Sequence, residues 1–206
     1  MARISLLFVS KVYRAQIAGQ KGEKLVRDLR DAAHMIAKHD RAGRAWSRDH
    51  DYPGYTSYAS LDDLPERDSL FAALVQVLDG HAQAYARDLD FDLKGRRLVL
   101  DSLWINVLDP GGHHSAHIHP HSVISGTIYL AVPKGASAIK FEDPRLPMLM
   151  AAPPRKDTAR EYNRTFVSVE PKAGTLLLWE SWLRHEVPVN RAKSARVSLS
   201  FNYGLR

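Results

Sequence analysis

The sequence predicts a mainly β domain with flanking helices, and three observations indicate this fold class. Eight short segments of alternating character follow residue 97, separated by Gly- and Pro-rich turns, which is typical of a sandwich or barrel. The chain before residue 97 has helical periodicity instead. Its 206 residues, 45% of them hydrophobic, suffice for one domain with a sizeable core. We therefore expect one domain over residues 1–206, with a helical part at 1–96, a β core at 97–206, and the helices outside one sheet.

The N-terminal part is expected to begin with a strand and to continue with two helices. The apolar run Ile4–Val9 is too short for a signal peptide or a membrane span, so we interpret it as an opening strand. Apolar spacing predicts a helix over Gly22–His39, with Gly43 as a stop signal. The residues Asp63–Glu66 have the form of a capping box, which predicts a second helix to about Leu89. Residues 46–60 are aromatic and turn-rich and show no helical period.

The C-terminal part reads as a succession of strands joined by turns. The expected strands are 98–108, 113–119, 123–132, 138–142, 165–169, 175–179, 185–189 and 196–203. One long irregular stretch, Asp143–Asn163, interrupts them and is rich in Pro, Met and Arg. A loop of this length in a small domain is typical of a lid or binding loop, so we expect it to be mobile without ligand. Together with the aromatic residues around Tyr55 and Tyr58, it is expected to form the substrate pocket.

Composition restricts the chemistry. The chain has no cysteine, which excludes disulfides, thiolate metal sites and a catalytic cysteine, and which fits a cytoplasmic location. The net charge of +6 and the pI of about 9.6 favour anionic partners. The basic residues are spread along the chain, however, and no nucleic-acid-binding motif accompanies them, so nucleic acid is not expected as a partner.

A cluster of histidines is the main functional signal. Five of the ten histidines lie between His113 and His121. On a strand, His117 and His119 project to the same face with their Cα atoms about 6–7 Å apart, which lets two imidazoles reach one ion. Neutral imidazole is a common ligand of iron, zinc and copper. The neighbours His113, His114 and His121 could replace His119, but strand parity favours His119.

A later histidine and an arginine complete the pattern. His185 precedes Arg196 by eleven residues, and Ser198 shares the strand face of Arg196. Three protein ligands on one face of an iron leave positions open for a bidentate co-substrate and O2. Arg196 could then clamp a carboxylate through two parallel hydrogen bonds, with the Ser198 hydroxyl beside it. The alternatives are that His185 is a capped surface histidine and that Arg196 forms an ion pair with a carboxylate of the protein itself.

These motifs resemble those of a known family, the iron(II)- and 2-oxoglutarate-dependent oxygenases of a largely uncharacterised bacterial and phage group. The matching segments are Gly54–Tyr58, Asp62–Leu64, Trp104–Asn106, His117–Tyr129, Phe141–Arg145, Trp182–His185 and Arg196–Asn202. The most specific part is the block His-x-His-Pro…Ser-Gly…Tyr that begins at His117. The resemblance covers most of the chain.

The resemblance implies a double-stranded β-helix, or cupin-like jelly roll, with Fe(II) at His117, His119 and His185. It further implies that Arg196 binds the cosubstrate 2-oxoglutarate. The residues implied as additional cofactor contacts are Asn106, Tyr129 and Ser198. One departure stands out, since the wider superfamily has Asp or Glu where this chain has His119. A site of three neutral ligands also suits zinc, copper or nickel.

Three functions remain open at this point. The first is a dioxygenase that uses O2 and 2-oxoglutarate to hydroxylate a small-molecule or peptide substrate that the sequence does not identify. The second is a cupin-type metalloenzyme that needs no 2-oxoglutarate, and the third is a non-catalytic module that binds a small ligand or anion. Arg196 and Ser198 favour the first, because a cosubstrate carboxylate needs such an anchor. A membrane partner is not expected, and a homodimer is compatible with the sequence.

Overall fold

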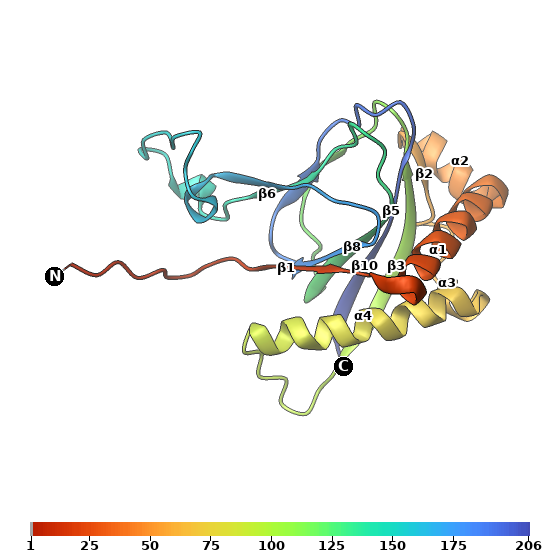
Figure 1. The fold of residues 1–206 in the computed structure, drawn as a ribbon, viewed down its shortest axis with the longest axis horizontal. Coiled ribbons are helices and arrows are strands. Elements are labelled where there is room, and N and C mark those ends of the chain that lie inside the picture. The colour runs from red at the N-terminus through yellow and green to blue at the C-terminus, as the bar shows by residue number, and fades with distance from the viewer. Residues whose placement is uncertain (1) are drawn as a thin grey trace.

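Two antiparallel sheets form the body of the protein in a computed structural model that describes residues 2–206 (Figure 1). The larger sheet has the order β1 (Val12–Gln16), β8 (Thr175–Glu180), β5 (Ile124–Ala131), β10 (Arg196–Leu205), β3 (Leu98–Leu108) and β2 (Gly54–Thr56). The smaller sheet has the order β4 (His114–His117), β9 (His185–Val187), β6 (Ile139–Glu142) and β7 (Phe166–Val169). This is a mainly β fold of the jelly-roll type, as the sequence predicted.

Helices cover the outer face of the larger sheet (Figure 1). They are α1 (Gly19–His39), α2 (Arg41–Asp49), α3 (Leu64–Arg67) and α4 (Ser69–Asp88). Leu29 of α1 and Leu74 of α4 are fully buried in one core with Ile105 and Leu199 of the sheet. The apolar stripe of each helix therefore faces the sheet, which confirms that the helices pack outside it.

The prediction of an opening strand at Ile4–Val9 is wrong. Residues 2–10 lie in no helix or strand, and all of them are exposed. The first strand is instead β1, which pairs with β8 from Val12↔Trp179 to Gln16↔Thr175. Apolar composition alone predicted the strand, but a strand needs a neighbour to satisfy its backbone, and Ile4–Val9 has none within the described chain.

Two of the helix signals also require correction. Gly43 does not stop a helix but lies inside α2, whose N-cap is Asp40, with the Asp40 side chain accepting from the Gly43 N–H at 3.0 Å. The predicted second helix is two helices, because Asp68 interrupts it and caps α4 by accepting from Leu70 N–H at 2.8 Å. Asp63 makes no side-chain cap, so the capping box is not formed.

The last strand, β10, lies at the centre of the larger sheet and lines the space between the two sheets. Its residues alternate: Val197, Leu199 and Phe201 are buried in the core beneath the helices, whereas Arg196 and Ser198 line the cleft on the opposite face. Across the sheet, Ser198 lies opposite Asn106 of β3 and Tyr129 of β5. These pairings bring three expected cofactor contacts together.

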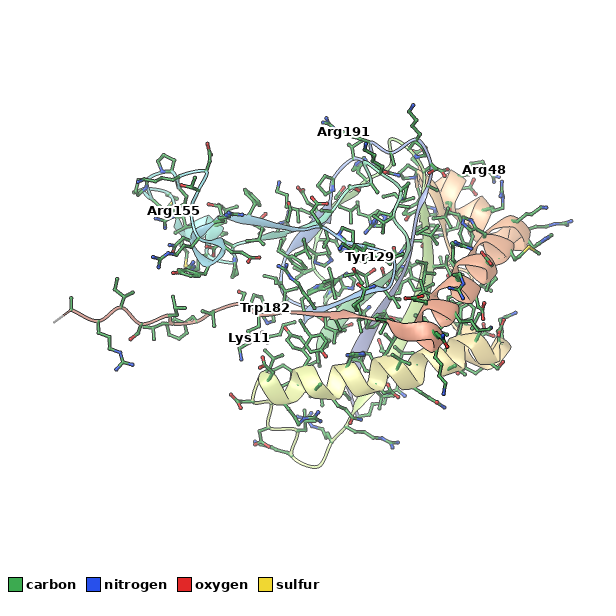
Figure 2. All side chains as sticks on the ribbon, viewed as in Figure 1. Lys11, Arg48, Tyr129, Arg155, Trp182 and Arg191 are labelled. Atoms are coloured by element: carbon green, nitrogen blue, oxygen red, sulfur yellow. The ribbon has the colours of Figure 1, made fainter. Side chains whose placement is uncertain are left out.

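The segment between β6 and β7 extends away from the body on the same side as the N-terminal residues, and Arg155 lies on it (Figures 1 and 2). It contains two short 3-10 helices, Leu146–Met148 and Glu161–Asn163. Within residues 2–206, no helix combines the length and apolar character that a membrane crossing would require.

Candidate metal centre

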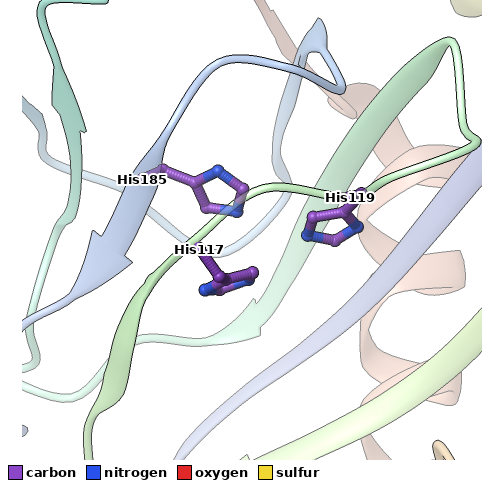
Figure 3. Close-up of side chains that lie close together, drawn as sticks. All are labelled: His117, His119 and His185. Atoms are coloured by element: carbon purple, nitrogen blue, oxygen red, sulfur yellow. The ribbon is translucent and has the colours of Figure 1, made fainter.

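Three histidines converge between the sheets (Figure 3). One nitrogen from each of His117, His119 and His185 lies within 4.8 Å of the other two, and their burial increases in that order. His117 ends β4 and His185 begins β9, and the two residues are paired across these strands. His119 lies just beyond β4, where its N–H donates to the Ser181 carbonyl at 3.0 Å. The alternation expected of a strand thus correctly predicted that His117 and His119 lie close together, although only His117 belongs to β4.

The orientation of each ring leaves one nitrogen available. Nδ1 of His117 lies 2.6 Å from the Ser115 carbonyl, and Nδ1 of His185 lies 2.9 Å from the Leu183 carbonyl. Because a carbonyl oxygen only accepts, each Nδ1 carries the hydrogen and each Nε2 presents a free lone pair. This arrangement, with one ring nitrogen donating to the protein and the other free, is typical of metal-binding histidines.

The ring of His119 is oriented in the same way, but its acceptor is a side-chain oxygen and not a backbone carbonyl. Its Nδ1 lies 2.8 Å from Oδ1 of Asn202, and its Nε2 is buried without a hydrogen-bond partner among residues 2–206. Asn202 Oδ1 also accepts from Ser125 Oγ at 2.8 Å, and Ser125 bonds to Ser181 Oγ at 2.8 Å. A buried, unpartnered imidazole nitrogen is costly unless it has a ligand. The donor set therefore fits a metal ion.

Burial favours the neutral form of His119 and His185, the form in which a histidine binds a metal. Burial lowers the pKa of His185 to about 3. The pKa of His119 is also lowered by burial, although the bond to Asn202 opposes that shift. Protons therefore compete weakly for these nitrogens at neutral pH.

The neighbouring histidines have other surroundings. His114 Nε2 lies 2.8 Å from the hydroxyl of Tyr52, which in turn donates to Asn106 Oδ1 at 3.2 Å. Neither His113 nor His121 belongs to the three-histidine group. The sequence singled out neither the Tyr52–His114 pair nor the roles of Asn202 and Ser181, because each contact joins residues far apart in the chain.

Arg196 is a buried cation that packs against an aromatic ring. It is only 2% exposed, and its guanidinium lies 4.7 Å from the ring centre of Tyr129. No Asp or Glu of residues 2–206 forms an ion pair with it, and both its Nε and the Tyr129 hydroxyl are buried without a hydrogen-bond partner. A fixed carboxylate of the protein, the alternative considered from the sequence, is therefore not its partner. A buried guanidinium in this state favours an anionic ligand.

A cleft of about 520 Å3 connects the two groups. The predicted site residues that line it are His117, His119, His185, Arg196, Ser198 and Asn106, whereas Tyr129 lies behind Arg196. Tyr58 and Trp104 also line the cleft, with ring centres 5.3 Å apart. The expectation for the pocket wall was partly wrong, since Tyr55 is buried elsewhere and residues 143–163 do not reach the cleft.

The comparisons with known proteins concern the sequence and the fold. Residues 102–202 match the family model described as "Putative 2OG-Fe(II) oxygenase". A comparison with curated proteins gives no match.

Three solved structures show the fold. A prolyl-4-hydroxylase from Pseudomonas putida has a TM-score of 0.61 at 15% identity, over 95% of this chain and 93% of that one. The non-heme alpha ketoglutarate dependent carbocyclase SnoK from nogalamycin biosynthesis has a TM-score of 0.64 at 15% identity, over 94% and 79%. HygX from Streptomyces hygroscopicus, with nickel and 2-oxoglutarate bound, has a TM-score of 0.57 at 15% identity, over 95% and 82%.

Fold and site together define a jelly-roll protein with a three-histidine group and a buried arginine facing one cleft. Residues 102–202 of the chain match the model of the 2OG-Fe(II) oxygenases, enzymes that use iron(II) and 2-oxoglutarate.

Proposed function

We propose that this enzyme holds a single iron(II) through the Nε2 atoms of His117, His119 and His185. The observation that carries the proposal is the arrangement of the three rings, since each Nδ1 lies beside an oxygen acceptor and one nitrogen of each ring lies within 4.8 Å of one nitrogen of each of the other two. The ligand set is uncharged, and the usual carboxylate is replaced by His119. The buried hydrogen bond from His119 to Asn202 supports its role as a ligand.

Arg196 is the proposed anchor for the distal carboxylate of 2-oxoglutarate. A carboxylate beside the guanidinium would give a partner to Arg196 Nε, which lacks one in the described chain. Ser198 and Asn106 lie on adjacent strands in the same cleft and can donate further hydrogen bonds. This anion site disfavours a cupin enzyme that works without 2-oxoglutarate.

The chemistry that iron(II) and 2-oxoglutarate supply when bound in this family is oxidation of a substrate by O2, and we propose hydroxylation as its outcome here. The chain's own residues position the reactants. The three imidazoles face the cleft, Arg196 fixes the far end of the cosubstrate, and Trp104 and Tyr58 offer an aromatic wall to an unidentified substrate.

The test is an anaerobic titration of the purified protein with Fe(II) and then 2-oxoglutarate, followed by visible absorption. We expect a weak charge-transfer band that requires both additions. Alanine at His117, His119 or His185 should sharply lower Fe(II) affinity, whereas His113→Ala is the matched control and should not. Full metal occupancy in all three variants would contradict the ligand assignment.

A separate substitution tests the anchor. Arg196→Lys keeps the positive charge but loses the planar pair of donors, so 2-oxoglutarate affinity should fall about ten- to a hundred-fold while Fe(II) affinity is unchanged. Isothermal titration of the Fe(II)-loaded proteins measures this difference. Equal affinity for 2-oxoglutarate in the two proteins would remove Arg196 from the site.

A further inference from the structure

A side-chain hydrogen bond joins the edges of the two sheets. Tyr52 lies two residues before β2, an edge strand of the larger sheet, and His114 begins β4, an edge strand of the smaller one. The Tyr52 hydroxyl lies 2.8 Å from His114 Nε2, and the centres of the two rings are 5.5 Å apart. Both residues line the same cleft as Arg196. The bond therefore ties the two walls of the cleft together on this side.

Tyr52 also contacts Asn106, one of the residues expected to bind the cosubstrate. The Tyr52 hydroxyl donates to Asn106 Oδ1 at 3.2 Å, so the Tyr52 oxygen is left to accept from His114 Nε2. Burial lowers the pKa of His114 to about 3, so its ring is neutral and carries one hydrogen, which these bonds place on Nε2. His114 thus holds Tyr52, and Tyr52 holds the amide of Asn106.

These contacts fix which way the Asn106 amide faces. Its Nδ2 donates to Ser200 Oγ at 3.1 Å, which uses one of the two hydrogens on that nitrogen. Reversing the amide would break this bond and leave the Tyr52 hydrogen facing an N–H donor. Asn106 is only 3% exposed, lines the cleft and lies opposite Ser198 in the register of β3 and β10. Its second N–H is therefore held ready for an acceptor in the cleft.

We propose that Tyr52 is a positioning residue for the cosubstrate: it orients the Asn106 amide to donate to the distal carboxylate of 2-oxoglutarate, and His114 holds Tyr52 in place. The inference rests on the proposed function, because Asn106 meets that carboxylate only where Arg196 anchors it. Tyr52 acts through Asn106 and not by its own contact with the cosubstrate. A tyrosine that merely packed in the cleft wall would show no such dependence on Asn106.

The first experiment is an anaerobic isothermal titration of the Fe(II)-loaded protein with 2-oxoglutarate. Tyr52→Phe keeps the ring but removes the hydroxyl, so it should weaken 2-oxoglutarate binding about two- to ten-fold, as expected for one neutral hydrogen bond, and leave Fe(II) affinity unchanged. Tyr13→Phe is the matched control and should bind 2-oxoglutarate as the wild type does. The Tyr13 hydroxyl also bonds to a histidine, with His81 Nδ1 at 2.9 Å, but neither residue lines the cleft.

A double-mutant cycle separates positioning from packing. Asn106→Ala removes the amide that Tyr52 is proposed to orient, so adding Tyr52→Phe to this variant should cause no further loss of 2-oxoglutarate affinity. If the two losses multiply instead, Tyr52 does not act through Asn106 and the proposal is wrong. This result is independent of how tightly the wild type binds.

Substitution of His114 tests the other end of the chain of bonds. His114→Gln keeps an N–H donor for the Tyr52 oxygen and should retain most of the 2-oxoglutarate affinity, whereas His114→Leu should lose about as much as Tyr52→Phe. Circular dichroism checks that each variant is folded. If Tyr52→Phe does not fold, the two His114 variants provide the same comparison, and equal affinity in both would contradict the proposal.

The outcomes distinguish this inference from the proposed function. A wild type that binds no 2-oxoglutarate, or an Arg196→Lys variant that binds it equally well, would overturn the anchor and this inference with it. Binding that is weakened by Arg196→Lys but not by Tyr52→Phe would overturn the role of Tyr52 alone.

Discussion

At the scale of single residues, the distinctive feature is His119, where the resemblance noted from the sequence implies a carboxylate in the wider superfamily. His119 is held by the amide oxygen of Asn202, which itself accepts from Ser125, while the amide nitrogen of Asn202 donates to Ser102 Oγ at 3.1 Å. The sequence could pair His117 with His119 because their spacing on a strand is local information, whereas the order of motifs along the chain and the family resemblance pointed to His185. It could not identify Asn202 as the residue that orients His119, because 83 residues separate the two.

Substitution of Asn202 should therefore change metal binding without direct contact to the ion. Asn202→Leu removes the acceptor for His119 Nδ1 and should weaken Co(II) or Fe(II) binding about 10- to 100-fold. Asn202→Asp restores an acceptor and should recover most of the affinity. Metal titration followed by absorption measures both variants. If the two variants bind metal equally weakly, Asn202 has a packing role instead.

At the scale of secondary-structure elements, local sequence patterns predicted the strands of the β core. They failed for elements whose structure depends on packing against distant residues. The eight strands of the β core occur within a few residues of their expected bounds, since turn signals separate them along the sequence. The strand β2 and the helix α2 were missed. Gly43 was interpreted as a stop, yet it lies inside α2. A glycine is required there because neighbouring side chains occupy the space of a Cβ atom: Ser60 Oγ would be 2.6 Å and Tyr55 Cε2 2.9 Å from that atom.

The surroundings of Gly43 predict opposite effects for substitutions at two helical glycines. Gly43→Ala should lower the free energy of unfolding by about 1–3 kcal/mol, because its methyl group would overlap Asp40, Tyr55 and Ser60. Gly80 lies in α4, where an added methyl group would meet no neighbouring side chain within 4 Å, so Gly80→Ala should raise the free energy of unfolding by about 0.5–1 kcal/mol. Urea denaturation compares the two. A stabilising Gly43→Ala would show that the neighbours move aside.

At the scale of the whole molecule, the stability of the metal-free protein depends on histidines that stay neutral. Burial lowers the pKa of His185 to about 3 and, together with the charge of Arg196, lowers that of His114 to about 3. In the unfolded chain each has an ordinary pKa near 6.5. Between these values the unfolded state binds protons that the folded state does not, so stability is present above about pH 6.5 and is lost as the pH falls toward 3.

The predicted size is about 1.4 kcal/mol of unfolding free energy per pH unit for each such histidine in this window. Urea denaturation of the metal-free protein at pH 7 and pH 4.5 measures the total loss, to which paired carboxylates also contribute. His114→Gln should make the loss smaller by one histidine's share. Identical losses in wild type and His114→Gln would mean that His114 is protonated in the folded state.

The position of β10 restricts where insertions and deletions can be tolerated in the chain. Arg196, proposed to bind the cosubstrate, and Asn202, which orients His119, stand on the same face of one strand, an even number of residues apart. Inserting or deleting one residue between Arg196 and Asn202 would turn one of these two side chains from the cleft to the core. An apolar neighbour such as Leu199 would then point into the cleft. A change of two residues would keep the facing but shift one group by about 7 Å along the strand. Insertions and deletions should therefore accumulate in the β6–β7 segment and be excluded from β10.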